Sequence, residues 1–428
     1  MLDIKFIREN PDRVKKGCKA KQVKVDIDQL LEIDKKRRES LKEVESSRAE
    51  ENRLSYLVSK ERDSTKRDEL IKRGQEIKTK IRNYEDYLKR TTEEFERLIL
   101  QIPNLPLEDV PIGKDEKDNV VLREIGEKTK FQFKPKDYLE IAQNLDLVDV
   151  KRAAKVAGTR FGYLKNEAPL LEFALINLAF DTLTPLGFIP VIPPVMIKPE
   201  MAIGMGYPEQ FDGEEAYYFE KDNLYLIATA EQALGAMHAG EIFTQIDLPR
   251  RYLGFSTCFR REAGAYGKDT RGIFRVHQFD KVEMFSFCRP EDSKKEHHFF
   301  LEMEEKLMKS LKIPYRVVQI CTGDLGFPTA AKYDIEAWLP SENRYRETHS
   351  TSNCTDFQAR RLNIKYQIAD TRIKRLAFVH TVNGTACAIG RTLIAIIENY
   401  QQKDGSILVP EVLQKYTGFK QIFGGPAS

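Results

Sequence analysis

A long stretch without proline constrains the fold of this chain more than any other feature of its sequence. No proline occurs between Pro11 and Pro103, Gly74 is the only glycine after Gly17 in that stretch, and charged residues dominate it. Proline breaks helices and glycine weakens them, so this composition predicts long helices. In the second half of the stretch, a heptad seam is formed by residues spaced alternately by four and three: Leu70, Gly74, Ile77, Ile81, Tyr84, Leu88, Thr91, Phe95, Leu98 and Ile102.

The first half has a weaker seam and is joined to the second half by a polar segment. Its apolar positions are Ile27, Leu30, Leu41, Val44 and Val58, and they are interrupted by Asp34, Arg37, Arg48, Glu51 and Ser55. Residues 60–66 are uniformly polar, so we expect the chain to reverse direction there. The predicted result is an antiparallel helical hairpin that projects on the order of 50 Å, at about 1.5 Å per residue.

The charge of this hairpin permits two interpretations. Residues 12–102 hold 25 Lys and Arg against 20 Asp and Glu, a larger positive balance than the +3 of the whole chain of 428 residues. Because both signs are interspersed, composition alone favours a solvated structural coiled coil. An arm that binds nucleic acid is the alternative.

The remaining chain predicts a second domain of a different class. Prolines at 103 and 106 end the hairpin, and we expect two domains, residues 1–110 and 111–428. The second has an α+β pattern without a P-loop, so side chains and a sheet would have to hold any nucleotide. Six scattered cysteines without a C-x-x-C pair argue against disulfides and zinc. The absence of a membrane-length apolar run or a leader-like start favours a cytoplasmic protein with no membrane contact.

The segment 253–287 reads as two strands around a polar, glycine-rich loop at 263–272. Side-chain alternation places on one face Ser256, Cys258, Arg260 and Glu262 of the first strand, with Arg275, His277, Phe279, Lys281 and Glu283 of the second. A register symmetric about the loop would put Arg260 opposite Arg275. Facing arginines are favourable chiefly when an anion such as a polyphosphate lies between them. Phe279 could then stack on a purine, and a surface laced with ion pairs is the alternative.

Three other segments place polar groups where chemistry could use them. Thr229 and Gln232 suit a capping box at a helix start, which leaves Glu231 unexplained. Glu347 and Ser350, within a polar run at 344–354, are hard oxygen ligands that suit Mg²⁺, although a solvated loop is favoured from sequence alone. Arg391 precedes a helix expected at 392–400, where the helix dipole disfavours a cation unless an anion bridges the two.

The run Phe259-Arg260-Arg261-Glu262, with the loop and the segment 275–283, resembles motif 2 of the class II aminoacyl-tRNA synthetases, specifically of the seryl-tRNA synthetase family. The segment 187–194, after an apolar helix at 170–183, resembles motif 1, and the segment 378–391 resembles motif 3. The resemblance covers nearly the whole chain. It implies an α+β fold, with the class II antiparallel sheet and flanking helices preceded by the helical arm.

The resemblance also implies roles for the residues at matching positions. ATP would be bound by Arg260, Arg261, Glu262, Arg275, Val276, Phe279, Glu347, Thr348, His349, Ser350 and Arg391. Catalysis would rest on Arg260, Arg275 and Arg391. Serine would be bound by Thr229, Ala230, Glu231, Arg260, Glu283 and Thr385. Mg²⁺ would be held by Glu347 and Ser350, and no zinc is expected.

The implied function is the ATP-dependent activation of L-serine to seryl-adenylate and its transfer to serine tRNA. The arm would embrace the long variable arm of that tRNA, selenocysteine tRNA stays open as a second acceptor, and motif 1 would form a homodimer. One alternative is an adenylating ligase that acts on a carrier protein, against which the long arm argues. The other is a non-enzymatic coiled-coil or RNA-binding scaffold, which leaves three arginines and Phe279 unexplained.

Overall fold

The computed structural model describes residues 1–207, 216–263, 271–368 and 375–423, so most of the loop expected at 263–272 lies outside the described residues. The chain divides into two compact units, Met1–Pro103 and Asn104–Ser428. The expected boundary lay a few residues later, at residue 110. Asn104 explains the difference, because its side-chain amide donates to the main-chain oxygens of Pro328 at 2.9 Å and Cys354 at 2.8 Å.

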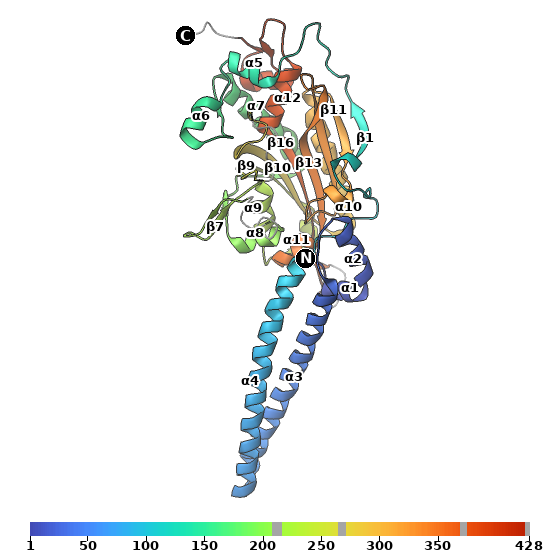
Figure 1. The fold of residues 1–428 in the computed structure, drawn as a ribbon, viewed down its shortest axis with the longest axis vertical. Helices are drawn as coiled ribbons and strands as arrows, with labels where there is room; N and C mark the ends of the chain where they lie inside the picture. The colour runs from blue at the N-terminus through green and yellow to red at the C-terminus, as the bar shows by residue number, and fades with distance from the viewer. Residues whose placement is uncertain (208–215, 264–270, 369–374, 424–428) are drawn as a thin grey trace. The chain divides into compact units, whose positions relative to one another are not determined.

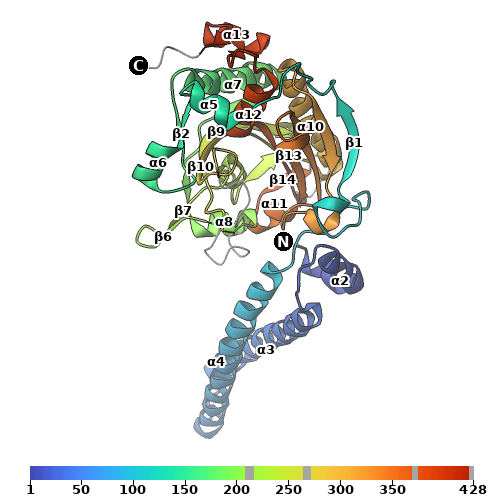
Figure 2. The ribbon, with the colours of Figure 1, turned by 45° about the horizontal axis from the view of Figure 1, so that its top comes forward.

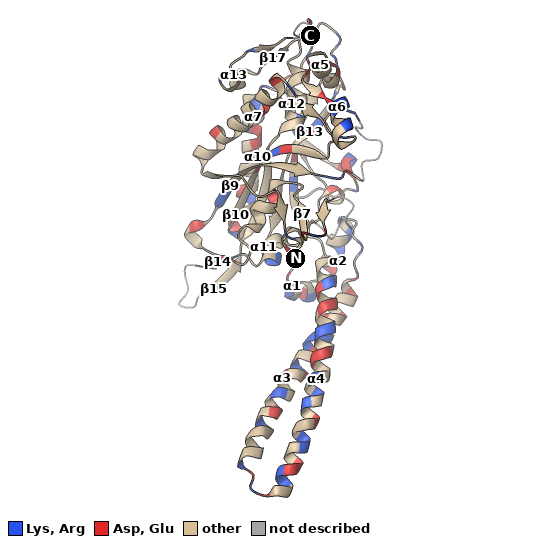
Figure 3. Ribbon diagram, turned by 90° about the vertical axis from the view of Figure 1, so that its left-hand side faces the viewer, with Lys and Arg blue, Asp and Glu red and all other residues tan. Residues whose placement is uncertain are grey.

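The first unit is helical, and its two long helices lie side by side as an antiparallel hairpin (Figure 1). Its helices are α1 (Ile4–Glu9), α2 (Pro11–Ala20), α3 (Ile27–Lys60) and α4 (Ser64–Leu100). Asp26 and Asp63 cap the long helices, since their carboxylates accept from the main-chain N–H groups of Gln29 and Lys66. The predicted reversal at 60–66 is confirmed. Lys, Arg, Asp and Glu alternate along both helices (Figure 3).

The seam of the hairpin follows the prediction in α4 and departs from it in α3. Every predicted seam position of α4 is buried or half-buried. In α3, Leu41 is 41% exposed and lies outside the seam, whereas its neighbour Ser40 is buried. The Ser40 hydroxyl donates to Lys36 O at 2.8 Å, which satisfies it within its own helix and lets a small polar residue occupy the interface. Ser47 and Leu54 are buried likewise.

Asp34, predicted as an interruption of the seam, is fully buried near one end of α3. Its carboxylate lies 3.4 Å from Arg8 of α1, 3.3 Å from Arg37 and 3.0 Å from Arg38. A buried charge is tolerated when it is paired and hydrogen-bonded, and three guanidiniums meet that condition. Asp34 therefore ties α1 to the hairpin.

The second unit is built on an eight-stranded sheet in the described part of the chain, with strand order β1-β11-β12-β13-β16-β10-β9-β4. All neighbouring pairs are antiparallel except β4 and β9. The strands are β1 (Val120–Ile125), β4 (Phe188–Val191), β9 (Arg250–Phe259), β10 (Gln278–Cys288), β11 (Tyr315–Gln319), β12 (Ala331–Leu339), β13 (Arg344–Thr355) and β16 (His380–Ala388). The predicted α+β architecture, an antiparallel sheet with flanking helices, is confirmed.

Helices cover this sheet (Figures 1 and 2). Together with the sheet they form two apolar cores. The larger core joins the sheet to α5 (Tyr138–Asn144), α7 (Glu167–Leu183), α10 (Ser293–Ser310), α12 (Ile389–Asn399) and α13 (Glu411–Thr417). The smaller core joins it to α8 (Pro199–Met205), α9 (Ala230–Ala236) and α11 (Phe357–Leu362). The short helix α6 (Val150–Ala157) follows β2.

Small sheets complete the second unit. Their strands are β2 (Val148–Asp149) with β3 (Tyr163–Leu164), β5 (Met196–Ile197) with β7 (Leu224–Leu226) and β6 (Tyr218–Phe219), β8 (Ile242–Thr244) with β14 (Lys365–Ile368) and β15 (Arg375–Phe378), and β17 (Ile407–Leu408) with β18 (Gln421–Ile422). Across the ranges described above, none of the helices combines the length and the apolar character that a bilayer crossing would need.

Candidate active site

A cavity of about 80 Å³ lies where β10, β13, β16 and the start of α12 meet the segment that follows β9. Its lining comprises Arg260, Glu262, Ile273, Phe274, Arg275, Val276, Phe279, Lys281, Glu347, Thr348, Ser350, Thr385, Ala388, Gly390 and Arg391. The structure therefore brings together residues that are far apart in the sequence. They include the three arginines and most of the other residues predicted to bind ATP.

The register of β9 and β10 corrects the predicted pairing of Arg260 with Arg275. Phe259 pairs with Gln278, and one step further the main-chain N–H of Arg260 donates to His277 O at 2.9 Å. The register of the two strands is therefore offset from the assumed one, and Arg275 meets Glu262 instead, with Nη1 to Oε2 at 3.1 Å. The predicted like-charge pair is an ion pair. Both side chains still line the cavity.

Each of the three arginines is held by specific contacts. Arg260 donates from Nε to Ala228 O at 3.3 Å, and its guanidinium carbon lies 5.1 Å from the centroid of the Phe279 ring. Arg391 lies 3.1 Å from the carboxylate of Glu347 and donates to Glu347 O at 3.2 Å. Such contacts restrict the rotamers of long side chains, so the cations are already oriented toward the cavity.

Glu347 lies on a strand rather than in the solvated loop that sequence alone favoured, because residues 344–355 form β13 between β12 and β16. Burial opposes ionisation of Glu347, but the charges of Arg391, Lys332 and Arg260 lower its pKa to about 2. Its side chain keeps 44% of its exposure and remains an anion over the whole neutral range. With the Ser350 hydroxyl in the same lining, it offers two hard oxygen donors of the kind that Mg²⁺ prefers.

A second cluster, of buried polar side chains, adjoins the cavity and contains most of the predicted serine-binding residues. Thr229 donates to Glu283 at 3.2 Å, and Lys281 lies 2.5 Å from the same carboxylate. Thr385 pairs with Glu283 in the register of β10 and β16. Glu231 is buried beside them, with its carboxylate accepting from Tyr207 at 2.7 Å and Gln358 at 3.0 Å. This cluster could select a small polar ligand through its amine and hydroxyl groups.

Burial raises the pKa of Glu231, and the charge of Glu283 raises it further, whereas the hydrogen bonds from Tyr207 and Gln358 lower it. Two acidic side chains therefore share this buried cluster, with Lys281 as a counter-charge 2.5 Å from Glu283. A cationic amine entering here would relieve the repulsion between them.

The start of α9 confirms the predicted cap in part. Thr229 is the N-cap and accepts from Glu231 N at 3.2 Å. Gln232, predicted to complete the capping box, instead accepts from the N–H of Ala228, one residue before the cap. Ala230 is fully buried in the smaller core, so its side chain packs rather than facing a ligand.

Two residues predicted to bind ATP lie outside the lining of the cavity. Arg261 is exposed, with its guanidinium carbon 5.7 Å from the ring centroid of Tyr217. The His349 ring is buried, and burial lowers its pKa to about 4. The pairing of β12 with β13 shifts register at Thr348, so that Thr348 lines the cavity next to Glu347, whereas the His349 ring lies 2.8 Å behind the Thr348 hydroxyl.

The residues of the site that the sequence interpretation missed include Phe274, Lys281, Tyr207 and Gln358. Lys281 had a signal, since strand alternation placed it on the same face as Phe279 and Glu283. Phe274 had none, although its ring lies 3.8 Å from the guanidinium carbon of Arg346 and 5.0 Å from that of Arg391. Tyr207 and Gln358 reach Glu231 only through tertiary packing.

Comparisons with known proteins agree with this geometry. Residues 1–106 match the family model of the seryl-tRNA synthetase N-terminal domain, and residues 217–400 match that of the tRNA synthetase class II core domain (G, H, P, S and T). The serine–tRNA ligase of Dictyoglomus thermophilum is 48% identical over 425 residues, which cover 99% of both chains. That of Pyrococcus horikoshii is 44% identical over 447 residues, covering 99% of this chain and 97% of the relative.

Solved structures give the same result in three dimensions. The crystal structure of seryl-tRNA synthetase from Pyrococcus horikoshii complexed with ATP superimposes with a TM-score of 0.93, at 43% identity and full coverage of both chains. The cytoplasmic serine–tRNA ligase of Naegleria fowleri in complex with AMP gives a TM-score of 0.87 at 35% identity, covering 100% of this chain and 99% of the other.

Proposed function

This chain belongs to the seryl-tRNA synthetase family, and we propose that its cavity activates L-serine with ATP and passes the seryl group to tRNA. The observation that carries the proposal is the union of three oriented guanidiniums and an aromatic ring with a buried, hydroxyl-lined acidic cluster. A triphosphate, a purine and an amino acid with a hydroxymethyl side chain find complementary groups there. Neither a carrier-protein ligase nor a non-enzymatic scaffold is supported by relatives that match along the whole chain.

The chemistry follows from where charge develops. The serine carboxylate attacks the α-phosphorus of ATP, the bond to the pyrophosphate breaks, and seryl-adenylate forms. Negative charge grows on the phosphoryl oxygens in the transition state, and Arg260, Arg275 and Arg391 are the groups that stabilise it. The 3′-terminal ribose hydroxyl of the tRNA then attacks the seryl carbonyl and releases AMP. Positioning and electrostatics suffice, without a covalent enzyme intermediate.

We assign the remaining site residues by the same logic. Phe279 would stack on the purine, and Glu262 would accept from its amino group. Glu231 and Glu283 would bind the amine and hydroxyl of serine, with Thr229 and Thr385 completing the pocket. An analogue without the hydroxyl leaves a buried partner unpaired, so the site would reject it strongly.

Glu347 and Ser350 would hold a Mg²⁺ ion that arrives with ATP. The ionised, half-exposed carboxylate and the adjacent hydroxyl fit that ion, and phosphate oxygens and water would complete its coordination. The ion would neutralise charge on the phosphates while Arg391 orients them.

Three proposals concern the whole chain. The helical arm binds serine tRNA, for which the match to the family's N-terminal domain and the interspersed basic residues of α3 and α4 are the support. The enzyme works in the cytoplasm, where its tRNA is found.

The third proposal is that the enzyme forms a homodimer through residues 187–194, where Ile192 is 82% exposed and Ile189 is 40% exposed. Ile192→Glu should yield monomers in sedimentation experiments, whereas Ile246→Glu, at an isoleucine that is 93% exposed, should not.

The exchange of pyrophosphate into ATP tests the reaction directly. We expect exchange that depends on L-serine and Mg²⁺ and requires no tRNA. Threonine and alanine should support much less exchange, because a methyl group crowds the pocket in one case and the hydroxyl is missing in the other. Equal exchange with either amino acid would contradict the serine assignment. Transfer of serine to a carrier protein but not to tRNA would instead favour the ligase alternative.

A further inference from the structure

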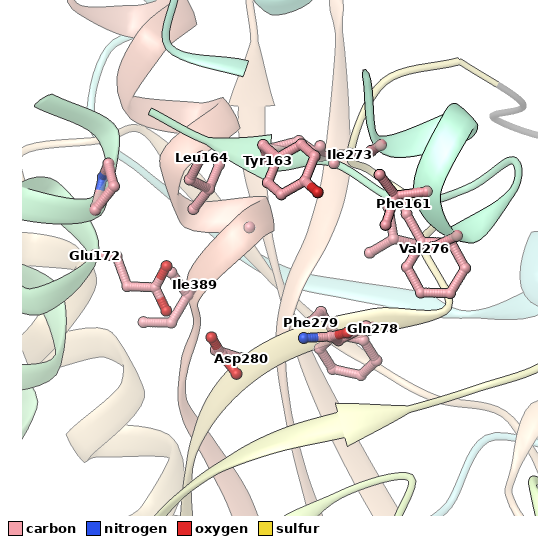
Figure 4. Close-up of a pocket in the computed structure, with 16 residues that line it drawn as sticks. Phe161, Tyr163, Leu164, Glu172, Ile273, Val276, Gln278, Phe279, Asp280 and Ile389 are labelled. Carbon is pink, nitrogen blue, oxygen red and sulfur yellow. The ribbon is translucent and has the colours of Figure 1, made fainter. Parts of the chain in front are cut away.

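We call the cavity of about 80 Å³, to which we assign ATP, the nucleotide cavity. A second cavity, of about 470 Å³, adjoins it and shares with it Ile273, Val276, Phe279 and Gly390. Most of its lining is apolar, and among the described residues that line it only Glu172 and Asp280 carry charge. Figure 4 shows these two carboxyl groups turned toward each other. Two like charges facing each other across an apolar cavity require an explanation.

The two carboxyl groups come from different elements. Glu172 lies on α7, and Asp280 lies on β10 between Phe279 and Lys281. Both of those neighbours line the nucleotide cavity, whereas Asp280 lines the second cavity together with Glu172 of α7. Its Oδ1 atom is buried and receives no hydrogen bond from the other donors that the structure describes. A proton on Glu172 would supply the missing donor.

The surroundings of the pair support that protonation state. Burial raises the pKa of Glu172, and the hydrogen bond with Asp280 and the charge of Asp280 raise it further, to about 8. The other titratable groups nearby are the thiol of Cys387 on β16 and the phenol of Tyr163 on β3. Burial raises the pKa of the Cys387 thiol to about 12, so this thiol adds no charge at neutral pH.

We propose that Glu172 is a positioning residue for the nucleotide site: its protonated carboxyl donates to Asp280 and so fixes the start of β10 with Phe279 in place. The inference rests on the proposed function, because it assumes that Phe279 stacks on the purine of ATP. It assigns to α7 a role in nucleotide affinity, although Glu172 does not line the nucleotide cavity.

The proposal fixes the sign of a pH effect. Below about pH 8 the pair shares one proton and Phe279 is held. As the pH rises through that value, Glu172 ionises, the two carboxylates repel each other, and β10 loses its tie to α7. The affinity for ATP should therefore fall at alkaline pH. Glu172→Gln keeps a donor toward Asp280 at every pH and should abolish this fall.

Calorimetric titration of the full-length protein with ATP and Mg²⁺, between about pH 6.5 and pH 9.5, tests the proposal. For the unmodified protein we expect the Kd for ATP to rise on the order of fivefold across this range, the scale of one lost hydrogen bond. Glu172→Gln should show a flat profile. The Kd for ATP of Asp280→Asn should likewise not change with pH, and this variant provides the test if Glu172→Gln folds poorly. Glu167→Gln, on the same helix but outside both cavities, should follow the unmodified protein.

A second measurement reports the proton itself. Because the pKa of Glu172 is raised from 4.5 to about 8, the folded state binds the extra proton between these values, so the unmodified protein should lose stability relative to Glu172→Gln as the pH rises through them. An identical alkaline loss of ATP affinity in Glu172→Gln, or a stability difference independent of pH, would overturn the proposal and leave the proposed function intact. Failure of every form to bind ATP at any pH would overturn both.

Discussion

The charged residues of the nucleotide cavity are oriented by their own ion pairs. Arg275 lies against Glu262 at 3.1 Å, and Arg391 lies against Glu347 at the same distance. Each acid is itself a residue that we assign to ATP or its metal. The carboxylates thus hold the guanidiniums in the lining of the cavity. In the proposed reaction, the arginines would stabilise the transition state strongly because they are in place before charge develops.

Arg391→Ala and Arg260→Ala should each lower the rate of serine-dependent pyrophosphate exchange by a factor of about a hundred or more, the usual effect of removing one preorganised donor. The loss should appear in kcat, because these contacts strengthen in the transition state. Arg123→Ala is the matched control, since it also breaks an ion pair, with Glu305 at 2.6 Å, but lies outside the cavity. Full exchange activity in Arg260→Ala would show that the phosphates lie elsewhere.

Phe279→Ala should mainly raise the KM for ATP, because stacking on a purine is equal in the ground state and the transition state. The KM for serine provides an internal comparison and should stay unchanged, since serine is assigned to the cluster around Glu231 and Glu283. Initial rates measured over a range of both substrates separate the two constants. A large fall in kcat with an unaltered KM for ATP would contradict the placement of the purine on this ring.

At the scale of elements, the arm owes its stability to the packing of α3 against α4. Its seam contains small and polar residues, among them Ser40, Ser47, Gly74 and Thr91, so it buries less apolar surface than an ideal coiled coil. Ion pairs between the helices, such as Arg48 with Glu85 at 2.5 Å, are exposed and contribute little. The arm should therefore respond measurably to small gains in helix propensity.

Gly74→Ala should stabilise α4 by up to about 1 kcal/mol, which slows local opening by a factor of about five. The substitution fits because nothing lies within 4 Å of the position that a Cβ would take. Hydrogen exchange of α4 peptides in the full-length protein measures the effect. Gly187→Ala is the contrasting control: there is also room for a Cβ, but φ is +87°, and an L side chain should destabilise the protein. Faster exchange in α4 of Gly74→Ala would mean that the glycine serves the packing.

At the scale of the whole molecule, the two units correspond to two recognition tasks. The residues assigned to ATP and serine all belong to the unit that begins at Asn104. The seam of the arm is formed by α3 and α4 themselves, so we expect the chemistry of adenylation not to depend on it. In our proposal the arm recognises tRNA, through phosphate contacts that would read shape more than base identity.

Replacing residues 26–101 by a short flexible linker should separate the two half-reactions. Pyrophosphate exchange should persist, whereas charging of tRNA should collapse. With the intact enzyme, charging should weaken steeply as salt is added while exchange does not, because phosphate contacts release counterions. Normal charging by the shortened protein would favour the interpretation of the arm as a structural coiled coil.

The sequence by itself determined the helical arm, the order of the motifs and the residue types of the site. These are local properties: the absence of proline, heptad spacing and strand alternation act over a few turns or residues. A resemblance to known motifs then assigned Glu231, Glu347 and Ser350, for which the residues alone favoured a solvated loop or gave no explanation.

Only the tertiary structure decided which groups meet. The pairing of Arg275 with Glu262 depends on the register of the two segments, and side-chain alternation along each strand does not determine that register. The hydrogen bonds of Tyr207 and Gln358 with Glu231 join segments far apart in the chain. The burial of Ser40 instead of Leu41 was set by the facing helix. The facing of Glu172 and Asp280 likewise follows from the packing of α7 on the large sheet. The interaction energies of these contacts depend on pairs of residues that are far apart in the sequence, so no local sequence pattern predicts them.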